Sequence, residues 1–476
     1  MHVKRAEPDR RKLLWYLDPE GNVALQLTFL GGAGTVTGSK YVVANDRDIV
    51  LVDCGLFQGF KTLRLKNWAP FPIDPRKISA VALTHAHLDH SGYLPLLVRN
   101  GFRGRIFCSR GTRDLCRILL PDSGFLQEKD AEFANRHGFS KHRPALPLYT
   151  LEDAQRCLDY FRPVSFDDTH ALAHAMTLRM HRAGHILGAA SLEIEAAGRT
   201  IVFSGDLGRY NDPTMVDPVG FDHADYLVVE STYGDRRHPD ADPEDAIGKV
   251  VETTIARGGT VVIPAFAVGR TQSLLFHLAQ LKDKGRLANV PIFLDSPMAE
   301  NASDIFCNNV GEHRLSESAC RRACGVARFV RSVEESKALM TNPMPKVIVS
   351  ASGMATGGRV LHHLKHYAPD PRNTILFAGF QAGGTRGASM VGGADAIKIH
   401  GAYVPVRAEV KNLDMLSGHA DAGEILRWLK GFSSPPKMTF ITHGEPTASD
   451  ALRRRIEEEL KWPCTVPEHG LEVELT

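Results

Sequence analysis

Short runs of hydrophobic residues, separated by Gly-rich or polar turns, fill the first half of the chain. The stretch Leu25–Val43, LQLTFLGGAGTVTGSKYVV, predicts a strand, a Gly-rich turn and a second strand. Further strands are predicted at Asp48–Gly55, Ile78–Thr84 and Tyr226–Thr232, and a hairpin at Leu192–Asp206. A helix, SGYLPLLVRNG, is predicted after the strand Ile78–Thr84. This half therefore has the pattern of a mixed α/β unit.

The pattern changes at about residue 240, where strand, Gly-rich turn and helix follow one another several times. Continuously apolar strands between helices are typical of a parallel sheet that is covered on both faces. Strands that end in polar residues return near the C-terminus, in LSGHAD and ITHGEP, so we expect the second unit to be inserted into the first. The predicted division is a charged leader at 1–24, a first domain at 25–237 and 405–476, and an inserted domain at 238–404.

Composition limits the classes of protein that need considering. The chain has 476 residues, of which 43% are hydrophobic and 24% charged, as in ordinary globular proteins. The net charge of +2 is close to neutral, so a nucleic acid would need a local basic patch. We expect no secretory signal and no membrane span, because the leader is charged and no apolar run approaches about 20 residues. Eight cysteines without a CxxC pair predict reduced thiols in a cytoplasmic protein.

The stretch THAHLDHSG, Thr84–Gly92, directly follows a predicted buried strand. It brings His85, His87, Asp89 and His90 into six residues. Neutral imidazoles and carboxylates are the ligands that zinc prefers outside thiolate sites. His85 and His87 alternate, so in extended backbone both point to one side, and the other two can face the same hollow after the chain turns. A polar surface loop is the alternative, but four potential ligands at this density predict a loop that serves two metal ions.

One loop cannot complete two metal shells, so more ligands are expected at other strand ends. His185 precedes a strand in HRAGHILGAAS, and Asp206 ends one in IVFSGDLG. His443 follows a strand in FITHGEP, and Asp53 ends one in LVDCG. Each of these residues alone is typical of a turn or of a hydrogen-bonded histidine. Together they supply the set that two zinc ions require, with manganese as the alternative metal.

At this point the sequence resembles a known family. HAHLDH is similar to the HxHxDH signature of the metallo-β-lactamase fold, and Asp53, His185 and Asp206 follow in that family's order. The fold that this resemblance implies is an αββα sandwich with its metals at one edge. According to the resemblance, one zinc is held by His85, His87, His185 and Asp206, and the other by Asp89, His90, Asp206 and His443. Asp206 then bridges the two ions, and Asp53 orients a ligand or the bridging water.

Three further motifs resemble the β-CASP subgroup of this fold. Glu230 in ESTYGDR, His419 in SGHAD and His443 in THGE are similar to its motifs A, B and C. PAFAVGR, DSPMA, SASGMATGGR and GFQAGGTRG are similar to its inserted cap domain, which implies a Rossmann-like α/β unit with a parallel sheet. The resemblance covers most of residues 25–450. It is to bacterial and archaeal relatives of the endonuclease subunit of the cleavage and polyadenylation specificity factor, and more distantly to RNase J.

The resemblance also implies a reaction. A pair of zinc ions suits phosphodiester hydrolysis, in which negative charge builds on the phosphoryl oxygens. Asp89, Glu230 and His419 are the predicted catalytic residues, with His419 held by Glu230 and acting as general acid on the leaving oxygen. Glu230 alone would be typical of a capping or salt-bridged carboxylate. Histidine at motif C, here His443, implies RNA rather than DNA, and single-stranded RNA is the expected substrate.

Gly-rich turns of the cap are the predicted phosphate contacts. SGMATGGR stands between a strand and a helix, where backbone N–H groups favour a phosphate, and GGTRG and PAFAVGR each add an arginine. A lone Gly-rich turn usually reflects tight packing, whereas three turns, each with an arginine, predict a phosphate-lined track. The predicted RNA-binding residues are Arg270, Ser352, Gly353, Gly357, Gly358, Arg359, Gly384, Thr385 and Arg386.

The resulting hypothesis is a zinc-dependent ribonuclease, an endonuclease with 5′–3′ exonuclease activity left open. One alternative is a small-molecule ester or lactam hydrolase on the same fold, which would not need an inserted cap or the pair of Glu230 and His419. A second alternative is an RNA-binding scaffold with a degenerate site. The intact set of predicted ligands argues against this alternative. Monomer and homodimer are both left open. The segment Asp122–Tyr149 is predicted as a helical arm near the cleft, without an assigned role.

Overall fold

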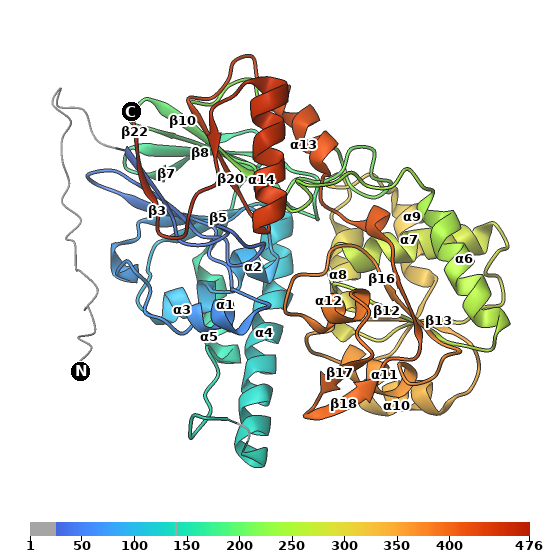
Figure 1. The fold of residues 1–476 in the computed structure, drawn as a ribbon. Helices are drawn as coiled ribbons and strands as arrows, with labels where there is room; N and C mark the ends of the chain where they lie inside the picture. The colour runs from blue at the N-terminus through green and yellow to red at the C-terminus, as the bar shows by residue number, and fades with distance from the viewer. Residues whose placement is uncertain (1–24, 139) are drawn as a thin grey trace, which may run out of the picture.

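A computed structural model of the chain describes residues 25–138 and 140–476. The predicted leader, residues 1–24, lies outside the described residues. The described part forms two α/β units that lie side by side (Figure 1). No helix within these ranges is long and apolar enough to cross a membrane.

Two seven-stranded sheets form the centre of the first unit. One consists, in spatial order, of β22 (Glu472–Leu475), β1 (Leu25–Phe29), β2 (Tyr41–Ala44), β3 (Ile49–Val52), β4 (Ala80–Ala82), β5 (Arg105–Cys108) and β6 (Phe161–Pro163). The other consists of β21 (Cys464–Thr465), β20 (Met438–Thr442), β11 (Tyr226–Glu230), β10 (Arg199–Phe203), β9 (Ala190–Ala196), β8 (Met176–Arg182) and β7 (Thr169–Ala173). Strands of both sheets contribute to one apolar core, which includes Phe29, Val43, Phe203 and Phe440.

Helices cover the outer face of each sheet. Beside the first sheet, α3 (Leu94–Arg99), α4 (Arg110–His137) and α5 (Leu151–Cys157) share an apolar core with strand residues such as Val81 and Ile106. Beside the second, α13 (Ala422–Leu429) and α14 (Pro446–Arg455) do the same with residues such as Leu227 and Ile441. The layers are therefore helix, sheet, sheet, helix, and the predicted αββα sandwich is confirmed. Two short helices, α1 (Lys61–Lys66) and α2 (Leu88–Ser91), lie in its loops.

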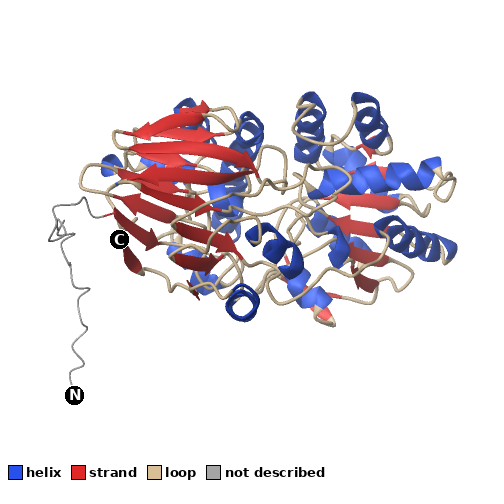
Figure 2. Ribbon diagram, turned by 90° about the horizontal axis from the view of Figure 1, so that it is seen from above, coloured by secondary structure: helices blue, strands red, loops and turns tan. Residues whose placement is uncertain are grey.

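The second unit, which we call the cap, contains a six-stranded sheet whose paired strands are all parallel. Its strands are, in spatial order, β14 (Arg328–Phe329), β13 (Ile292–Leu294), β15 (Val347–Ser350), β12 (Val261–Pro264), β16 (Thr374–Phe377) and β19 (Glu409–Asn412). Figure 2 shows helices on both sides of these strands, so the covered parallel sheet is confirmed. A two-stranded hairpin, β17 (Ala396–Ile399) and β18 (Ala402–Pro405), is added to this unit.

Two apolar cores, one on each face of the cap sheet, hold these helices. The first contains residues of α6 (Pro243–Ala256), α7 (Arg270–Asp283) and α8 (Pro297–Asn308). The second contains residues of α10 (Val333–Thr341), α11 (Val360–Tyr367) and α12 (Arg386–Val391). The helix α9 (Glu317–Gly325) packs against α7 and α8.

The cap is inserted between β11 and β20, which are parallel neighbours in the second sheet of the sandwich. One predicted boundary needs correction. We expected the cap to end at 404, but β19 at Glu409–Asn412 pairs in parallel with β16 and so belongs to the cap sheet. Only partly buried positions and one exposed position make up this edge strand, so it lacks the apolar run that marks the central strands.

Candidate metal centre and active-site cavity

Polar side chains from several strand ends meet at one edge of the sandwich. Asp53 follows β3, His85 follows β4, Asp206 follows β10 and His443 follows β20. Since β10, β11 and β20 are parallel neighbours, their carboxyl ends lie at the same edge of their sheet. The structure thereby brings the seven predicted ligands into two groups that could hold a metal ion: His85, His87, His185 and Asp206, and Asp89, His90 and His443.

The first group is tightly packed and buried. His87 Nδ1 lies 3.2 Å from both His85 Nε2 and His185 Nε2. Asp206 Oδ2 lies 3.4 Å from His85 Nε2 and 3.6 Å from His185 Nε2. A tetrahedral zinc ion with bonds of about 2.0–2.2 Å places its ligand atoms about 3.3–3.6 Å apart. The spacing of these four atoms therefore fits one zinc ion.

The second group lies on the other side of the same carboxylate. Asp206 Oδ1 is 3.3 Å from His90 Nε2 and 3.4 Å from His443 Nδ1. His443 Nε2 is 3.1 Å from His90 Nε2 and 3.6 Å from Asp89 Oδ2. The two oxygens of Asp206 thus face different groups, which is the position that a bridging ligand would need.

The electrostatics of the site favour a cation. Burial, with the neighbouring His90 second, holds the pKa of His85 well below its usual range, and burial also lowers the pKa values of His87 and His185. These imidazoles are therefore neutral and can offer lone pairs. Burial opposes ionisation of Asp206, but His443 and His90 outweigh it and keep its pKa well below the usual range. Among the described residues, buried Asp206 Oδ1 has no hydrogen-bond partner, so the donor set fits zinc.

Hydrogen bonds around the two groups fix the orientation of the rings. His185 Nδ1 lies 3.1 Å from the Gly418 carbonyl, and His90 Nδ1 lies 2.7 Å from Asp53 Oδ2. Both partners are acceptors, so each Nδ1 carries the proton and each Nε2 keeps its lone pair for a metal. Asp53 has left-handed backbone (φ 56°), and so does His443 (φ 48°). Such backbone is uncommon for non-glycine residues and is found where the surrounding fold holds a functional side chain in place.

Sequence reasoning missed two threonines that complete this arrangement. Thr84 donates its backbone N–H to Asp53 Oδ1 at 2.8 Å, and its hydroxyl lies 3.1 Å from His85 Nδ1. The Thr232 hydroxyl lies 3.1 Å from His443 Nδ1. A signal was present, because Thr84 directly precedes HAHLDH and Thr232 lies within ESTYGDR. The sequence does not indicate, however, which side chain a threonine contacts; that requires the arrangement of the strands.

Glu230 and His419 form a pair beside the predicted metal ligands. His419 Nδ1 lies 3.3 Å and 3.2 Å from the two carboxylate oxygens of Glu230. Burial lowers the pKa of His419, but the charge of Glu230 and its hydrogen bond outweigh burial and raise it. Glu230 also groups with Asp206 and His443 as a potential ligand set. Its carboxylate already accepts the backbone N–H groups of Leu207 (2.6 Å) and Thr232 (3.3 Å), which favours a partner of His419 over a ligand.

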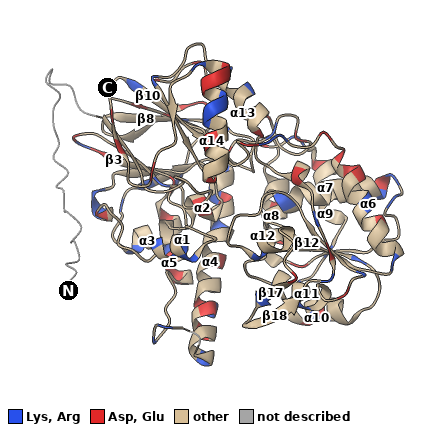
Figure 3. Ribbon diagram, viewed as in Figure 1, with Lys and Arg blue, Asp and Glu red and all other residues tan. Residues whose placement is uncertain are grey.

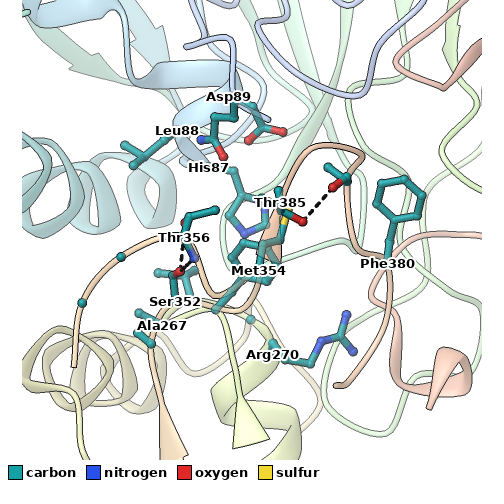
Figure 4. A pocket seen from close by; sticks show the side chains of 18 of the residues that line it. His87, Leu88, Asp89, Ala267, Arg270, Ser352, Met354, Thr356, Phe380 and Thr385 are labelled. Atoms are coloured by element: carbon teal, nitrogen blue, oxygen red, sulfur yellow. Dashed lines mark hydrogen bonds between the residues drawn. The ribbon is translucent and has the colours of Figure 1, made fainter. Parts of the chain in front are cut away.

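A cavity of about 1040 Å³ runs between the sandwich and the cap. His87, Asp89 and His419 line it from the sandwich, and Arg270 and Phe380 line it from the cap. Figure 4 shows Asp89 at the top of the view of this pocket, Arg270 near the bottom and Phe380 at the right. Elsewhere Lys and Arg are mixed with Asp and Glu over both units (Figure 3). Among the described residues, the cavity is therefore where a contact with a polyanion is expected.

Arg270 differs from the other two predicted arginines. Its guanidinium has no hydrogen bond to the described residues, its Nε is buried, and burial lowers its pKa to about 10. Arg359 instead donates to Asp295 Oδ1 (2.7 Å) and to the Val330 (3.0 Å) and Arg331 (2.8 Å) carbonyls. Arg386 donates to the Lys398 (2.6 Å), Ala355 and Thr356 carbonyls. These two arginines hold the cap turns together, whereas the Arg270 guanidinium donates no hydrogen bond to the described residues.

Most of the predicted Gly-rich turns also reach the cavity. Ser352, Gly357, Gly358, Gly384 and Thr385 line it, as do Arg359 and Arg386. Gly353 is not among the lining residues. A Cβ atom at Gly353 would lie 2.6 Å from the Phe266 ring, so this glycine is required by close packing. The Ser352 hydroxyl accepts the Thr356 N–H at 3.0 Å and closes the turn internally (Figure 4).

Comparison with known families decides how this geometry is classified. Three family models match consecutive parts of the chain: a beta-lactamase superfamily domain at 49–258, a Beta-Casp domain at 271–390 and a Zn-dependent metallo-hydrolase RNA specificity domain at 403–467. Ribonuclease TTHA0252 of Thermus thermophilus is 38% identical over 88% of this chain and 93% of its own length. The chain belongs to the β-CASP group of the metallo-β-lactamase family.

Other relatives match over similar lengths. The transcription termination factor FttA of Methanocaldococcus jannaschii is 30% identical over 94% of this chain and 72% of its own length. An RNase J-like protein of the same organism is 29% identical over 93% of this chain and 98% of its own. A crystal structure of a protein of unknown function from Enterococcus faecalis V583 covers 95% of this chain with a TM-score of 0.53 at 13% identity, which shows the fold alone.

Proposed function

We propose that this β-CASP protein is a ribonuclease that hydrolyses phosphodiester bonds of single-stranded RNA with two zinc ions. The observation that carries the proposal is the pair of Glu230 and His419 beside a two-group metal centre, inside a cavity that the cap closes. The names of the relatives support the substrate, since one is a ribonuclease and another an RNase J-like protein. The family description of residues 403–467 as an RNA specificity domain points the same way.

Two sets of residues, which share Asp206, would hold the two zinc ions. His85, His87, His185 and Asp206 would hold one zinc ion, and Asp89, His90, Asp206 and His443 the other. Bound zinc supplies activation of water at neutral pH and neutralisation of charge on the phosphoryl oxygens. Asp53 keeps the proton of His90 on Nδ1, so that Nε2 stays available as a ligand.

His419 is placed to supply the proton that the leaving 3′ oxygen needs. Glu230 lies on the Nδ1 side of the ring and is itself fixed by two backbone N–H groups. The opposite nitrogen, Nε2, is left for the cavity that His419 lines. The raised pKa favours the protonated form of this ring, which is the form that a general acid needs. Arg270, an uncommitted cation in the same cavity, would bind a phosphate of the strand.

The proposed activity is tested with labelled single-stranded RNA, the chromogenic lactam nitrocefin and a small thioester. We expect the zinc-loaded protein to cut the RNA, to lose that activity in a chelator and to regain it when zinc is restored. Products should carry 3′-hydroxyl and 5′-phosphate ends, because the 3′ oxygen leaves. If the lactam or thioester is turned over while the RNA survives, the protein is a small-molecule hydrolase and the proposal is wrong.

Replacing Arg270 tests the phosphate contact. We expect Arg270→Ala to raise the KM for RNA about tenfold to a hundredfold, because a charge-assisted hydrogen bond contributes about 1.5–3 kcal/mol. Arg270→Lys should recover part of the affinity. Arg322→Ala, at an exposed position of α9, is the matched control. An unchanged KM in Arg270→Ala would remove this residue from the binding site.

A further inference from the structure

The far half of α4 extends along the cap and exposes apolar side chains. Phe125, Leu126 and Phe133 are 44%, 41% and 42% exposed. The Phe133 ring lies 6.5 Å from the ring of His400 in the β17–β18 hairpin, so the helix and the hairpin are neighbours (Figure 1). The predicted helical arm is thus confirmed as far as His137, where α4 ends.

A groove between α4 and the hairpin continues the active-site cavity. Phe125, Leu126 and Asp130 of α4 and Ile397 and Lys398 of β17 line the same cavity as the metal ligands. We call the part formed by these five residues the arm groove. A strand that lies over the metal centre could extend into the arm groove without leaving the cavity.

The arm groove combines aromatic surface with positive charge. The Lys129 ammonium lies 5.5 Å from the centre of the Phe125 ring, and the Lys398 ammonium lies 5.8 Å from that of Tyr403, which is 74% exposed. Arg386 lines the cavity next to Lys398, to whose carbonyl it donates. Opposing charge comes from Asp122 and Asp130, which line the cavity, and from Glu132, which lies 2.8 Å from the Lys129 ammonium. Burial raises the pKa of both aspartates. Aromatic rings beside cations are the surface that single-stranded nucleic acids use, bases stacking while phosphates meet the charges.

We propose that the arm groove binds the nucleotides of a single-stranded RNA that lie beyond the scissile phosphate, with a base stacked on Phe125 and a backbone phosphate near Lys398. This inference rests on the proposed ribonuclease function and adds a binding subsite to it. RNA is favoured over a protein partner because the groove is continuous with the catalytic cavity. The subsite contacts only RNA long enough to reach α4, so it makes recognition dependent on length.

The test uses two labelled single-stranded RNAs that share one cleavage site, a short one that ends within the cavity and a long one. We expect Phe125→Ala and Phe125→Leu to raise the KM for the long RNA about tenfold, in line with the loss of one stacked base. The kcat and the KM for the short RNA should stay unchanged. Phe125→Trp should restore tight binding, because it restores an aromatic face. Val310→Ala, at a cap residue that is 58% exposed and does not line the cavity, is the matched control.

Two further measurements are made on each variant: RNA binding by fluorescence anisotropy, and oligomeric state by gel filtration. If no RNA is cut but Phe125→Ala still weakens binding of the long RNA, the ribonuclease function fails and the arm groove stands. If Phe125→Leu binds the long RNA as tightly as the unmodified protein does, the stacking subsite is wrong. It is also wrong if the variant loses the same affinity for the short RNA as for the long one. A change of oligomeric state in Phe125→Ala with unchanged RNA binding would make the surface a protein interface instead, and would also overturn the proposal.

Discussion

Asp206→Asn is expected to abolish RNA cleavage, lowering kcat/KM by at least about a thousandfold. The side chain keeps its shape but loses the charge that faces four histidines, at 3.4 and 3.6 Å through Oδ2 and at 3.3 and 3.4 Å through Oδ1. Since each oxygen serves a different ligand group, both zinc ions should be bound more weakly. The measurement is zinc content by elemental analysis after dialysis, together with the rate of RNA cleavage.

Two variants show whether the Asp206 result has the expected cause. Asp46→Asn alters an exposed carboxylate in a surface loop and should change neither zinc content nor rate. His443→Ala should lower zinc occupancy at the second group and leave the first group intact, because His443 lies only in the second. If Asp206→Asn retains two zinc ions per chain, the residue does not bridge them, and the assignment of the ligand groups is wrong.

His419→Ala is expected to retain both zinc ions and lose about a hundredfold to ten-thousandfold in kcat. The reason is that His419 pairs with Glu230 and belongs to neither of the two predicted ligand groups. Single-turnover cleavage and zinc content are measured on the same preparation. His366→Ala, an exposed histidine on α11, is the matched control.

Chemical rescue separates proton donation by His419 from a merely structural role. In an RNA with a 3′-phosphorothiolate at the scissile bond, sulfur replaces the leaving 3′ oxygen. The leaving group is then a thiolate, which needs no proton. His419→Ala should therefore cut this substrate nearly as fast as the unmodified protein does. Loss of zinc in His419→Ala would instead place the residue among the ligands, and an equal defect on both substrates would exclude general acid catalysis.

The metal centre could be predicted largely from the sequence, because its chemistry is local. HAHLDH concentrates four ligand side chains after a buried strand, a pattern that few other structures require. The distant residues Asp206 and His443 were accessible for a related reason, since each stands at the end of an apolar run, whereas His185 precedes a predicted strand. The convergence of Asp206 and His443 follows from the parallel arrangement of β10, β11 and β20. His185 comes from the connection between the antiparallel strands β8 and β9.

The cap was less predictable, because its details depend on partners that the sequence does not specify. Arg270, Arg359 and Arg386 each follow or lie within a Gly-rich turn, yet only the first is without hydrogen bonds from its guanidinium among the described residues. The partners of the other two are carbonyls and Asp295, brought near by folding. The strand β19 was missed because, as an edge strand, it carries Glu409 and Lys411 where a central strand would be apolar.

The order in which the chain is made has a consequence for when the catalytic centre forms. His85 and Asp206 precede the inserted cap, whereas His419 and His443 follow it. During translation, the ribosome must therefore complete the whole cap before the last predicted ligand, His443, and the proposed proton donor, His419, emerge. A nascent chain, or a fragment, that ends within the cap therefore carries the complete first ligand group but lacks both His419 and His443.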